Sequence, residues 1–441
     1  MNKEKNMQKN ILTPEEKDLA SINKIITEVS SEYDKLWIKR NRSINSKFLL
    51  SFIFHLTCNK HKGYGVSLLE LWDNYELQNI SAPQKKIFAP SSICEARQKF
   101  PEEIFVALNK KLISKFSKNK IKLPALNKHR VFAVDGSRLN LPKELTTEGY
   151  KTCSEGAHSP QGLVSCIYNI DTQVVHDFCL DKTLNERTCA LNHFNVLEED
   201  DVVIFDRGYF SYILLHQCKA NKIHPVFRLS VSLGNKAIQE FVSSKKTDSI
   251  VVYTPSDTIK YTIKRQGFDI KCSPIILRLI KYTINGQLYL YGTTLIGDEY
   301  DKSLFPKLYH RRWDIEELYK ISKCLIEVED FHSKTERGVK QEIYAHFVLI
   351  NLARFFESAS KIKYKNKSNN MKFNFKNCLN VIGKKIQTII FKSKILFNKT
   401  IAKITNSIFQ VRQRVRPMRK YQRISHKTFN KWVLNRSPYR S

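Results

Sequence analysis

Long apolar runs are missing from this sequence. Nowhere do apolar residues approach the roughly 18 in succession that a membrane-spanning helix needs, and the opening MNKEKNMQKN lacks the apolar core of a signal peptide. The Cys-x-x-Cys spacing is also missing, although ten cysteines are scattered along the 441 residues. Because zinc fingers and redox pairs need closely spaced thiols, we expect reduced, mostly buried cysteines. These absences predict a soluble, cytoplasmic protein with no membrane partner.

Two enzyme signatures are absent as well. No Gly-x-x-x-x-Gly-Lys-[Ser/Thr] loop occurs, so an ATP-driven reaction is not indicated. No His-Glu-x-x-His spacing occurs among the histidines, and we expect structural or surface roles for His158, His176, His193, His310 and His332.

Acidic residues are scarce. Lys and Arg number 74 against 42 for Asp and Glu, which gives a net charge of +32 and indicates a negatively charged partner, most commonly nucleic acid. Residues 358–441 contain no Asp or Glu and supply about two-thirds of this charge. They form either a basic tail or, because NVIGKKIQTIIFKSKILF keeps regular apolar spacing, at least one cationic amphipathic helix. Either version suits binding along a phosphate backbone.

Residues 1–125 are predicted to be helical. Residues 13–16, 67–70 and 92–95 each fit a capping box, the first with Pro at the opening helical position. Basic residues cluster among these helices, as in KIFAPSSICEARQKF. A DNA-reading module and a plain helical bundle both remain open for this region.

From about residue 130 the periodicity changes to that of an α/β domain. Five β-rich runs are RVFAVDGSRLNLP, GLVSCIYNI, QVVHDFCL, DVVIFDRGYF and IHPVFRLSV, and helix-like segments follow the third and fourth runs. This order predicts a sheet with helices on its faces over 126–230. Residues 231–300 contain alternating β segments without helical periodicity, which predicts a β-rich insertion, and 301–357 returns to the core with the apolar helix EIYAHFVLINLARFFES.

Two aspartates end apolar strands. Asp135 lies in VFAVDGSRLN and Asp206 in DVVIFDRGYF. A carboxylate in such a place is costly to bury without a cation or a hydrogen-bond partner. A helix N-cap or a structural ion pair would satisfy either aspartate alone.

A polar stripe follows in YHRRWDIEELYKISK. At about 100° per residue, Tyr309, Arg312, Glu316 and Lys323 fall within roughly 60° on one helix. The apolar residues occupy the other side, and they are Ile315, Leu318, Ile321 and Leu325. Alone, this pattern is typical of a solvated helix face. Together with two aspartates, Glu316 completes three carboxylates that could bind hard divalent ions such as Mg²⁺.

The motifs together resemble a known family. Tyr309, Arg312, Glu316 and Lys323 match the Tyr-x(2)-Arg-x(3)-Glu-x(6)-Lys signature of bacterial insertion-sequence transposases of the DDE class, in the group named after insertion sequence four. The strand VFAVDGSRL and the sequence Asp-Arg-Gly-Tyr at 206–209 resemble the two Asp-bearing strands of that group, and the resemblance covers roughly residues 85 to 360.

The resemblance implies a ribonuclease-H-like core with Asp135, Asp206 and Glu316 as catalytic metal ligands for two Mg²⁺ or Mn²⁺ ions. It implies DNA contacts by Arg312 and Lys323 at phosphates and by Tyr309 at the backbone. The basic motifs add four candidate DNA contacts: Arg97, Arg207, Arg416 and Arg419. The partners implied are the terminal inverted repeats and the target DNA, bound by a homodimer in the bacterial nucleoid.

The implied reaction is nicking at the element's end followed by attack of the freed 3′-hydroxyl. A DNA hairpin with a flipped base stacked on an aromatic ring is common in the group. The 231–300 insertion offers tyrosines such as Tyr261, Tyr289 and Tyr291 but no Trp, and Trp313 is expected to pack rather than to stack on a base. A metal-dependent nuclease on the same fold and a non-catalytic DNA-binding inhibitor from a decayed element remain alternatives.

Overall fold

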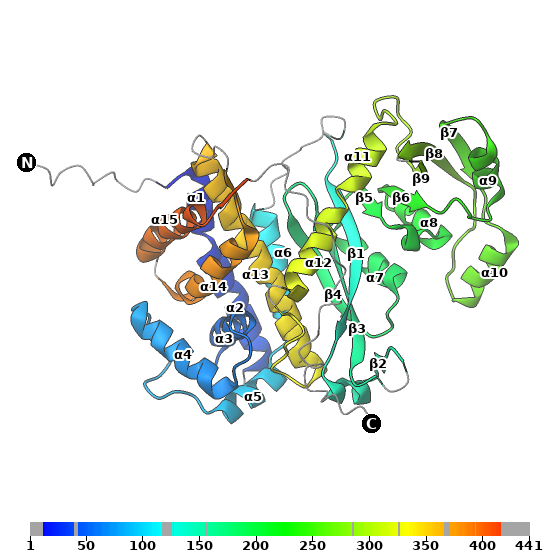
Figure 1. Cartoon of the computed structure of the whole chain (residues 1–441). Coiled ribbons are helices and arrows are strands. Elements are labelled where there is room, and N and C mark those ends of the chain that lie inside the picture. The colour runs from blue at the N-terminus through cyan, green and yellow to red at the C-terminus, as the bar shows by residue number, and fades with distance from the viewer. Residues whose placement is uncertain are drawn as a thin grey trace, which may run out of the picture.

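The structure is a computed structural model, and it describes residues 12–38, 43–116, 126, 128–154, 157–284, 286–324, 327–365, 371–392 and 394–415. Figure 1 shows a helical body beside a long twisted sheet, with the segment between β6 and α11 forming the far end of the sheet. No helix in the described part of the chain is both long enough and apolar enough to cross a bilayer.

Nine strands form one mixed sheet. In spatial order, β2, β3, β1, β5, β6, β9, β8 and β7 are neighbours, and β4 pairs with β3. Strands β1, β5 and β6 are parallel to one another, and the other pairings are antiparallel. The strands are β1 (Val131–Asn140), β2 (Lys151–Thr152), β3 (Pro160–Asn169), β4 (Val174–Asp181), β5 (Val202–Phe205), β6 (His224–Leu229), β7 (Asp248–Tyr253), β8 (Ile275–Ile284) and β9 (Gln287–Thr293). A separate pair joins β10 (Met371–Lys372) to β11 (Gln413–Arg414).

The α-helices fall into three groups along the chain. Before the sheet come α1 (Pro14–Leu19), α2 (Ile22–Trp37), α3 (Ser46–Cys58), α4 (Tyr64–Leu77), α5 (Pro90–Lys99) and α6 (Glu103–Phe116). Between strands come α7 (Glu186–Asn192), α8 (Tyr212–Ala220), α9 (Lys236–Ser243) and α10 (Asp257–Arg265). After the sheet come α11 (Leu304–His310), α12 (Trp313–Cys324), α13 (Glu336–Lys363), α14 (Phe375–Phe391) and α15 (Lys394–Gln410). Short 3-10 turns are η2 (Lys143–Glu148), η3 (His193–Val196) and η4 (Arg207–Tyr209).

The sheet is buried on both faces, which explains its nearly continuous apolar strands. Successive residues of a strand alternate between two hydrophobic cores: Ala133 and Ile204 contribute to the core under α11, α12 and α13, whereas Val134 and Phe205 contribute to the core under α7, α8, α9 and α10. The predicted order of strands and helices over 126–230 is confirmed.

Helix α13 joins the sheet to the helical body. It packs against β4 on one side and against α3, α6, α14 and α15 on the other. Buried Glu16 of α1 accepts hydrogen bonds from Lys363 Nζ (2.7 Å) and Thr405 Oγ1 (2.6 Å). Helix α14, the predicted cationic amphipathic helix, packs on α2 and α3. Residues before and after the sheet therefore share one helical body.

The insertion differs from the prediction of β structure alone. Its strands β7, β8 and β9 extend the main sheet, but α9 and α10 lie among them. Ser256 caps α10 by accepting the Ile259 N–H, and Ile263 is buried on the inner side of the helix. The β-branched residues of DTIKYTIKR resemble a strand in composition, yet the cap and the four-residue spacing of Ile259 and Ile263 favour a helix.

One of the three capping-box predictions is confirmed. Thr13 and Glu16 form the reciprocal capping bonds at the start of α1. The other two are wrong, because α4 begins at Tyr64 and α5 at Pro90, which places Ser67 and Ser92 inside helices. In both cases earlier residues extend the helix, so the Ser-x-x-Glu pattern does not mark its start.

A candidate carboxylate site on the sheet

Asp135 and Asp206 lie side by side on two parallel strands. Asp206 directly follows the end of β5, whereas Asp135 lies in the middle of β1 and not at the end of its strand, as the sequence had suggested. Val134 of β1 pairs with Phe205 of β5, and each aspartate is the next residue of its chain. The apolar residues before each aspartate anchor it, since they fill the two cores between sheet and helices. The parallel pairing of β1 with β5 ends at Val134 and Phe205, so the two aspartates stand where these strands part, and β1 continues beside β3 to Asn140.

Glu316 approaches from α12, in the first turn of that helix. Ile315 and Leu318 are buried against the sheet, as the apolar side of the stripe predicts. The Tyr319 hydroxyl lies within hydrogen-bonding distance of the Asp135 and Val164 carbonyl oxygens, at 2.9 and 3.1 Å. Helix α12 is thereby fixed across β1 and β3, and Glu316 is carried toward Asp135.

The predicted single helix is in fact two. Helix α11 ends at His310 and α12 begins at Trp313, so Arg312 lies in the break between them. The apolar residues of α11, such as Phe305 and Leu308, are buried like those of α12. Tyr309 and Arg312 therefore lie at the bend between two helices. The predicted single straight helix does not contain this bend.

Arg312 links the carboxylates. Its Nη1 lies 3.5 Å from Asp135 Oδ2, and its Nη2 donates to Glu316 Oε1. The residue is only 5% exposed, and its Nε has no hydrogen-bond partner among the described residues. A single buried cation therefore bridges two acidic groups at this place.

Tyr309 holds the other aspartate. Its hydroxyl donates to Asp206 Oδ1 at 2.6 Å, and its ring lies 5.6 Å from both the Tyr291 ring and the Arg312 guanidinium. Burial raises the pKa of Tyr309, and the hydrogen bond to Asp206 raises it further. The phenol thus stays protonated and remains a donor to Asp206 at neutral pH.

The two aspartates are electrostatically unlike. Burial raises the pKa of Asp135 to about 6, although the Arg312 guanidinium and the Gly136 N–H (2.9 Å from Oδ1) both lower it. Burial also acts on Asp206, but hydrogen bonds from Tyr309 and the Arg207 N–H lower its pKa overall. Without a bound cation, Asp206 is the more readily ionised of the pair.

Lys323 and Arg207 flank this group. Lys323 Nζ donates to the Arg138 carbonyl at 2.6 Å, joining the end of α12 to β1. Arg207 is exposed in η4, next to Asp206. Arg207 is thus the direct neighbour of Asp206, and Lys323 binds the strand that carries Asp135; their contacts to DNA stay a prediction.

The remaining candidate DNA contacts are not at this site. Arg97 is 3% exposed, and its guanidinium donates to Glu342 Oε1, Gln341 Oε1 and the Gly338 carbonyl, each at 3.0 Å. This burial against α13 contradicts a DNA contact by Arg97, whose partners are far away in the sequence. Arg416 and Arg419 lie outside the described residues.

Two further charged residues act on the aspartates and were not among the predicted site residues: Glu186 and Arg228. Glu186 is half-buried and is the first residue of α7. Burial has the largest effect on the pKa of Asp135 and raises it, Arg312 lowers it, and the negative charge of Glu186 raises it further. The positive charge of Arg228 in β6 is one of the groups that lower the pKa of Asp206. Its guanidinium lies 4.8 Å from the Tyr289 ring. Glu186 follows the helix cap Asn185 in LNERTCA, which was the available signal. Arg228 offered none, because its proximity depends on strand pairing.

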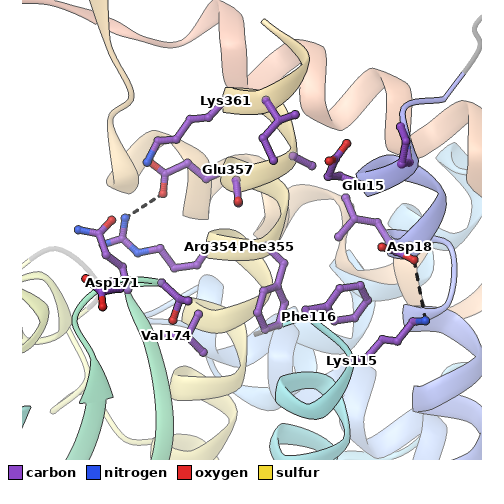
Figure 2. A pocket seen from close by; sticks show the side chains of 17 residues that line it. Glu15, Asp18, Lys115, Phe116, Asp171, Val174, Arg354, Phe355, Glu357 and Lys361 are labelled. Atoms are coloured by element: carbon purple, nitrogen blue, oxygen red, sulfur yellow. Dashed lines mark hydrogen bonds and ion pairs between the residues drawn. The ribbon is translucent and has the colours of Figure 1, made fainter. Parts of the chain in front are cut away.

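Two cavities of the core lie one beside the carboxylates and one away from them. One of about 530 Å³ borders the site between α7, η4 and α8, and it includes Glu186, Arg187 and Gly208. Another of about 340 Å³ lies between α1, α6, α13 and the turn after β3 (Figure 2). In the latter the charged groups face one another, with Arg354 bonded to Glu357 (2.8 Å) and Lys115 near Asp18 (3.8 Å).

The donor set at the site fits a divalent cation. Carboxylate oxygens are the ligands that Mg²⁺ and Mn²⁺ prefer. The guanidinium of Arg312 shows that Asp135 and Glu316 turn toward a common positive charge, so it marks where a cation is attracted. The three acids Asp135, Asp206 and Glu316 are called the carboxylate triad below.

Comparison with known proteins identifies the class. Residues 126–352 match the family model described as "Transposase DDE domain", and the chain belongs to this family of DNA transposition proteins. No curated protein matches the chain. Among solved structures, it is similar to a piggyBac transposase synaptic complex with hairpin DNA determined by cryo-electron microscopy. That match has a TM-score of 0.44 and 10% sequence identity, and it covers 88% of this chain and 85% of that chain.

Proposed function

We propose that this protein is an insertion-sequence transposase that cleaves the ends of its element and joins them to target DNA. The observation that carries the proposal is the meeting of Asp135, Asp206 and Glu316 through Arg312 and Tyr309. The spatial order β4, β3, β1, β5, β6, with a helix bearing the third acid, supports a ribonuclease-H-like core. The family match covers all of these elements.

Asp135, Asp206 and Glu316 are the residues that would hold Mg²⁺ or Mn²⁺. The ions, two per site as expected from the family resemblance, supply charge that activates an oxygen nucleophile and stabilises the leaving oxygen of a phosphodiester. The protein positions its carboxylates in advance through strand pairing and Tyr319, which limits the reorganisation needed when DNA binds.

Arg312 has two states in this proposal. In the DNA-free protein it pairs with Asp135 and Glu316. If cations were bound by these acids, its guanidinium would be free to pair with a DNA phosphate, for which its planar donors are well suited. Arg207 and Lys323 would contact the DNA strand on either side, whereas Tyr309 is only 5% exposed and would act by holding Asp206.

The DNA partners are the ends of the element and the target duplex. A net charge of +32 supports binding along phosphate backbones, and the helical body carries the exposed lysines of α14. A homodimer that pairs two ends is the assembly expected for this reaction class.

A hairpin intermediate would need an aromatic ring near the triad. Trp313 lies at the start of α12 with its ring 6.0 Å from that of His310, yet it is 43% exposed, so part of the ring is accessible. Tyr289 lies under Arg228, whose charge acts on Asp206. We propose these two rings as the surfaces on which a flipped base would stack, with Trp313→Ala and Tyr289→Ala each reducing hairpin-ended product on a denaturing gel.

The deciding experiment is cleavage of a duplex that carries the element's own ends, with Mg²⁺ or Mn²⁺. Asp206→Ala and Glu316→Gln should abolish cutting, whereas Glu317→Gln should retain it, because Glu317 is exposed and pairs with Lys320. Joined products support transposition, and cutting without joining indicates a nuclease. Tight binding of the ends with no cutting under either ion would contradict catalysis and favour an inhibitor.

A further inference from the structure

Two free thiols and a histidine meet between β4 and α7. Cys179 lies in β4 and Cys189 in α7, and neither is in a disulfide. Cys189 and His193 are four residues apart on the consecutive turns of α7 and η3, which places them on one helical face. Both are fully buried, whereas Cys179 keeps part of its surface exposed. These three residues and Asp177 are called the Cys179 cluster.

Strand pairing brings His193 to the cluster. Ser165 of β3 lies opposite Cys179 of β4 in antiparallel register, so their side chains project from the same face of the sheet. Asp177, two residues before Cys179, projects from that face as well. His193 bridges the two strands there, since its Nδ1 lies 2.8 Å from Asp177 Oδ2 and its Nε2 lies 3.0 Å from Ser165 Oγ. The imidazole is therefore fixed beside the Cys179 thiol.

The sulfur of Cys179 has two polar neighbours, the Cys189 thiol and the His193 ring, which both hydrogen-bond to it. The bond from Cys189 has the largest effect on the pKa of Cys179 and lowers it, burial raises it, and His193 lowers it further. Burial lowers the pKa of His193, but hydrogen bonds with Asp177 and Cys179 raise it to about 9. The contact with Cys179 and burial both raise the pKa of Cys189. Cys179 is thus a thiolate beside an imidazolium, and Cys189 keeps its proton.

This arrangement is typical of a cysteine that reacts with oxidants. The thiolate is the nucleophilic form, and reactive cysteines are partly exposed and lie next to a positive charge. Redox-sensitive cysteines also have a second thiol nearby that resolves the oxidised sulfur. Buried Cys166 and Cys218 differ, because burial raises the pKa of each and neither is open to solvent.

We propose that Cys179 is a peroxide-reactive cysteine that forms a reversible disulfide with Cys189. The oxidant is a small peroxide such as hydrogen peroxide. The Cys179 thiolate attacks one peroxide oxygen, the O–O bond breaks, and the leaving hydroxide takes a proton from His193, which yields a sulfenic acid and water. The Cys189 thiol then attacks the sulfenic sulfur, the S–S bond forms, and the hydroxyl group leaves as water with the Cys189 proton. Both sulfurs are oxidised and both peroxide oxygens are reduced.

The disulfide would tie α7 to β4 behind the triad. Glu186, the first residue of α7, acts on Asp135 and lines the cavity of about 530 Å³ beside the carboxylates. Oxidation would therefore restrain the helix that borders the triad on the face of the sheet opposite to α12. Disulfides of this transient kind are the ones found in reducing compartments.

The test uses the full-length protein without DNA, treated with hydrogen peroxide and then alkylated to block the remaining free thiols. Cleavage on the N-terminal side of aspartates places Cys179 in residues 177–180 and Cys189 in residues 181–199. Mass spectrometry of the wild type should show these two peptides joined, and dithiothreitol should separate them. Cys153→Ser, which removes an exposed thiol elsewhere, should give the same linkage.

Variants separate the roles of the residues. With dimedone, which traps sulfenic acids, Cys189→Ser should be labelled at Cys179, whereas Cys179→Ser should carry no label at Cys189. His193→Gln keeps both thiols but should slow the linkage by about tenfold or more, since a cysteine of ordinary pKa is only a few per cent thiolate at pH 7.

Three results would overturn the proposal. In the wild type, they are that peroxide leaves both thiols free or that it joins Cys179 to another cysteine. In Cys179→Ser, it is that dimedone labels Cys189. Because the wild type alone supplies the first two, a variant that does not fold leaves the proposal open to refutation. None of these results bears on cleavage by the triad.

Discussion

At the scale of single residues, Arg312 has the largest effect on its neighbours. It is buried between Asp135 and Glu316 and has no other described partner for its Nε. A cation at this place competes with any metal ion for the same carboxylates. If the site binds metal ions as proposed, the guanidinium would have to give up these carboxylates when the ions bind.

Replacing Arg312 by Gln should have opposite effects on two quantities. Mn²⁺ affinity of the DNA-free protein should rise by about tenfold or more, since a positive charge a few ångströms from the ion is removed. DNA cleavage should fall, because the phosphate contact is lost. Calorimetry with Mn²⁺ and a cleavage assay measure the two, and Lys320→Gln on the exposed side of α12 is the control. Weaker Mn²⁺ binding in Arg312→Gln would contradict this role.

Asp135 predicts a pH dependence of stability. Its pKa is raised to about 6 from 3.8, so the folded protein holds a proton that the unfolded chain releases between these values. The free energy of unfolding contributed by Asp135 therefore falls as pH rises from about 4 to 6, by about 3 kcal/mol. Urea unfolding in EDTA should show this fall in the wild type relative to Asp135→Asn. The difference between the two free energies of unfolding should be constant above about pH 7. A difference that does not change with pH would be inconsistent with the buried setting.

Single residues also show where the sequence was sufficient. Asp135, Asp206 and Glu316 could be predicted as a group because each lies in a recognisable local pattern, an apolar strand or a helix signature, and their catalytic role stays a prediction. The buried position of Arg97 could not be predicted from the sequence, because the residues that bury it, Gln341 and Glu342, come from α13. Basic character alone does not distinguish a DNA contact from an internal ion pair.

At the scale of elements, the central strands were predictable and the insertion was only partly so. Four consecutive apolar residues in β5 fill both faces of the sheet, and their β-branched and aromatic side chains favour a strand. Helix α10 was mistaken for a strand because Thr, Ile and Tyr favour both interpretations until the cap at Ser256 is considered. The apolar residues of α11 and α12 are both buried in the core, although the chain breaks between the two helices. Hydrophobic periodicity along the sequence does not predict this break.

Tyr319 tests how α12 is fixed. Tyr319→Phe removes the hydroxyl that lies within hydrogen-bonding distance of the Asp135 and Val164 carbonyls, and we expect a loss of about 1–2 kcal/mol in the free energy of unfolding. Cleavage should also slow, because Glu316 is carried by the same helix. Urea unfolding measures the first effect, with Tyr261→Phe as control since that ring is 67% exposed. Equal stability of the two variants would show that α12 is held by apolar packing alone.

At the scale of the whole molecule, a buried ion pair joins the helical body to the core. Arg97 of α5 meets Glu342 of α13 at 3.0 Å, and His332 bonds the other carboxylate oxygen. Burial opposes ionisation of Glu342, but the positive groups hold its pKa at about 2. Its stabilising contribution is therefore complete above about pH 5 and is lost only as pH falls toward 2.

Glu342→Gln should destabilise the protein by about 3–5 kcal/mol at pH 7, because it leaves the Arg97 charge buried without a counter-ion. Urea unfolding measures this, with Glu28→Gln on exposed α2 as control. A double variant, Arg97→Met with Glu342→Gln, should recover part of the loss. A single variant as stable as the wild type would mean that Arg97 finds another partner.

The central position of α13 has a consequence for damaged copies of the gene. This helix covers β4 on one side and α3, α6, α14 and α15 on the other, and it begins at Glu336. A premature stop codon before that residue would remove the helix against which both the sheet and the helical body pack. Apolar side chains of both would then be exposed to water. Such truncated products should be cleared by proteolysis instead of competing for the element's ends. A natural antagonist of transposition would have to come from full-length copies with altered acids.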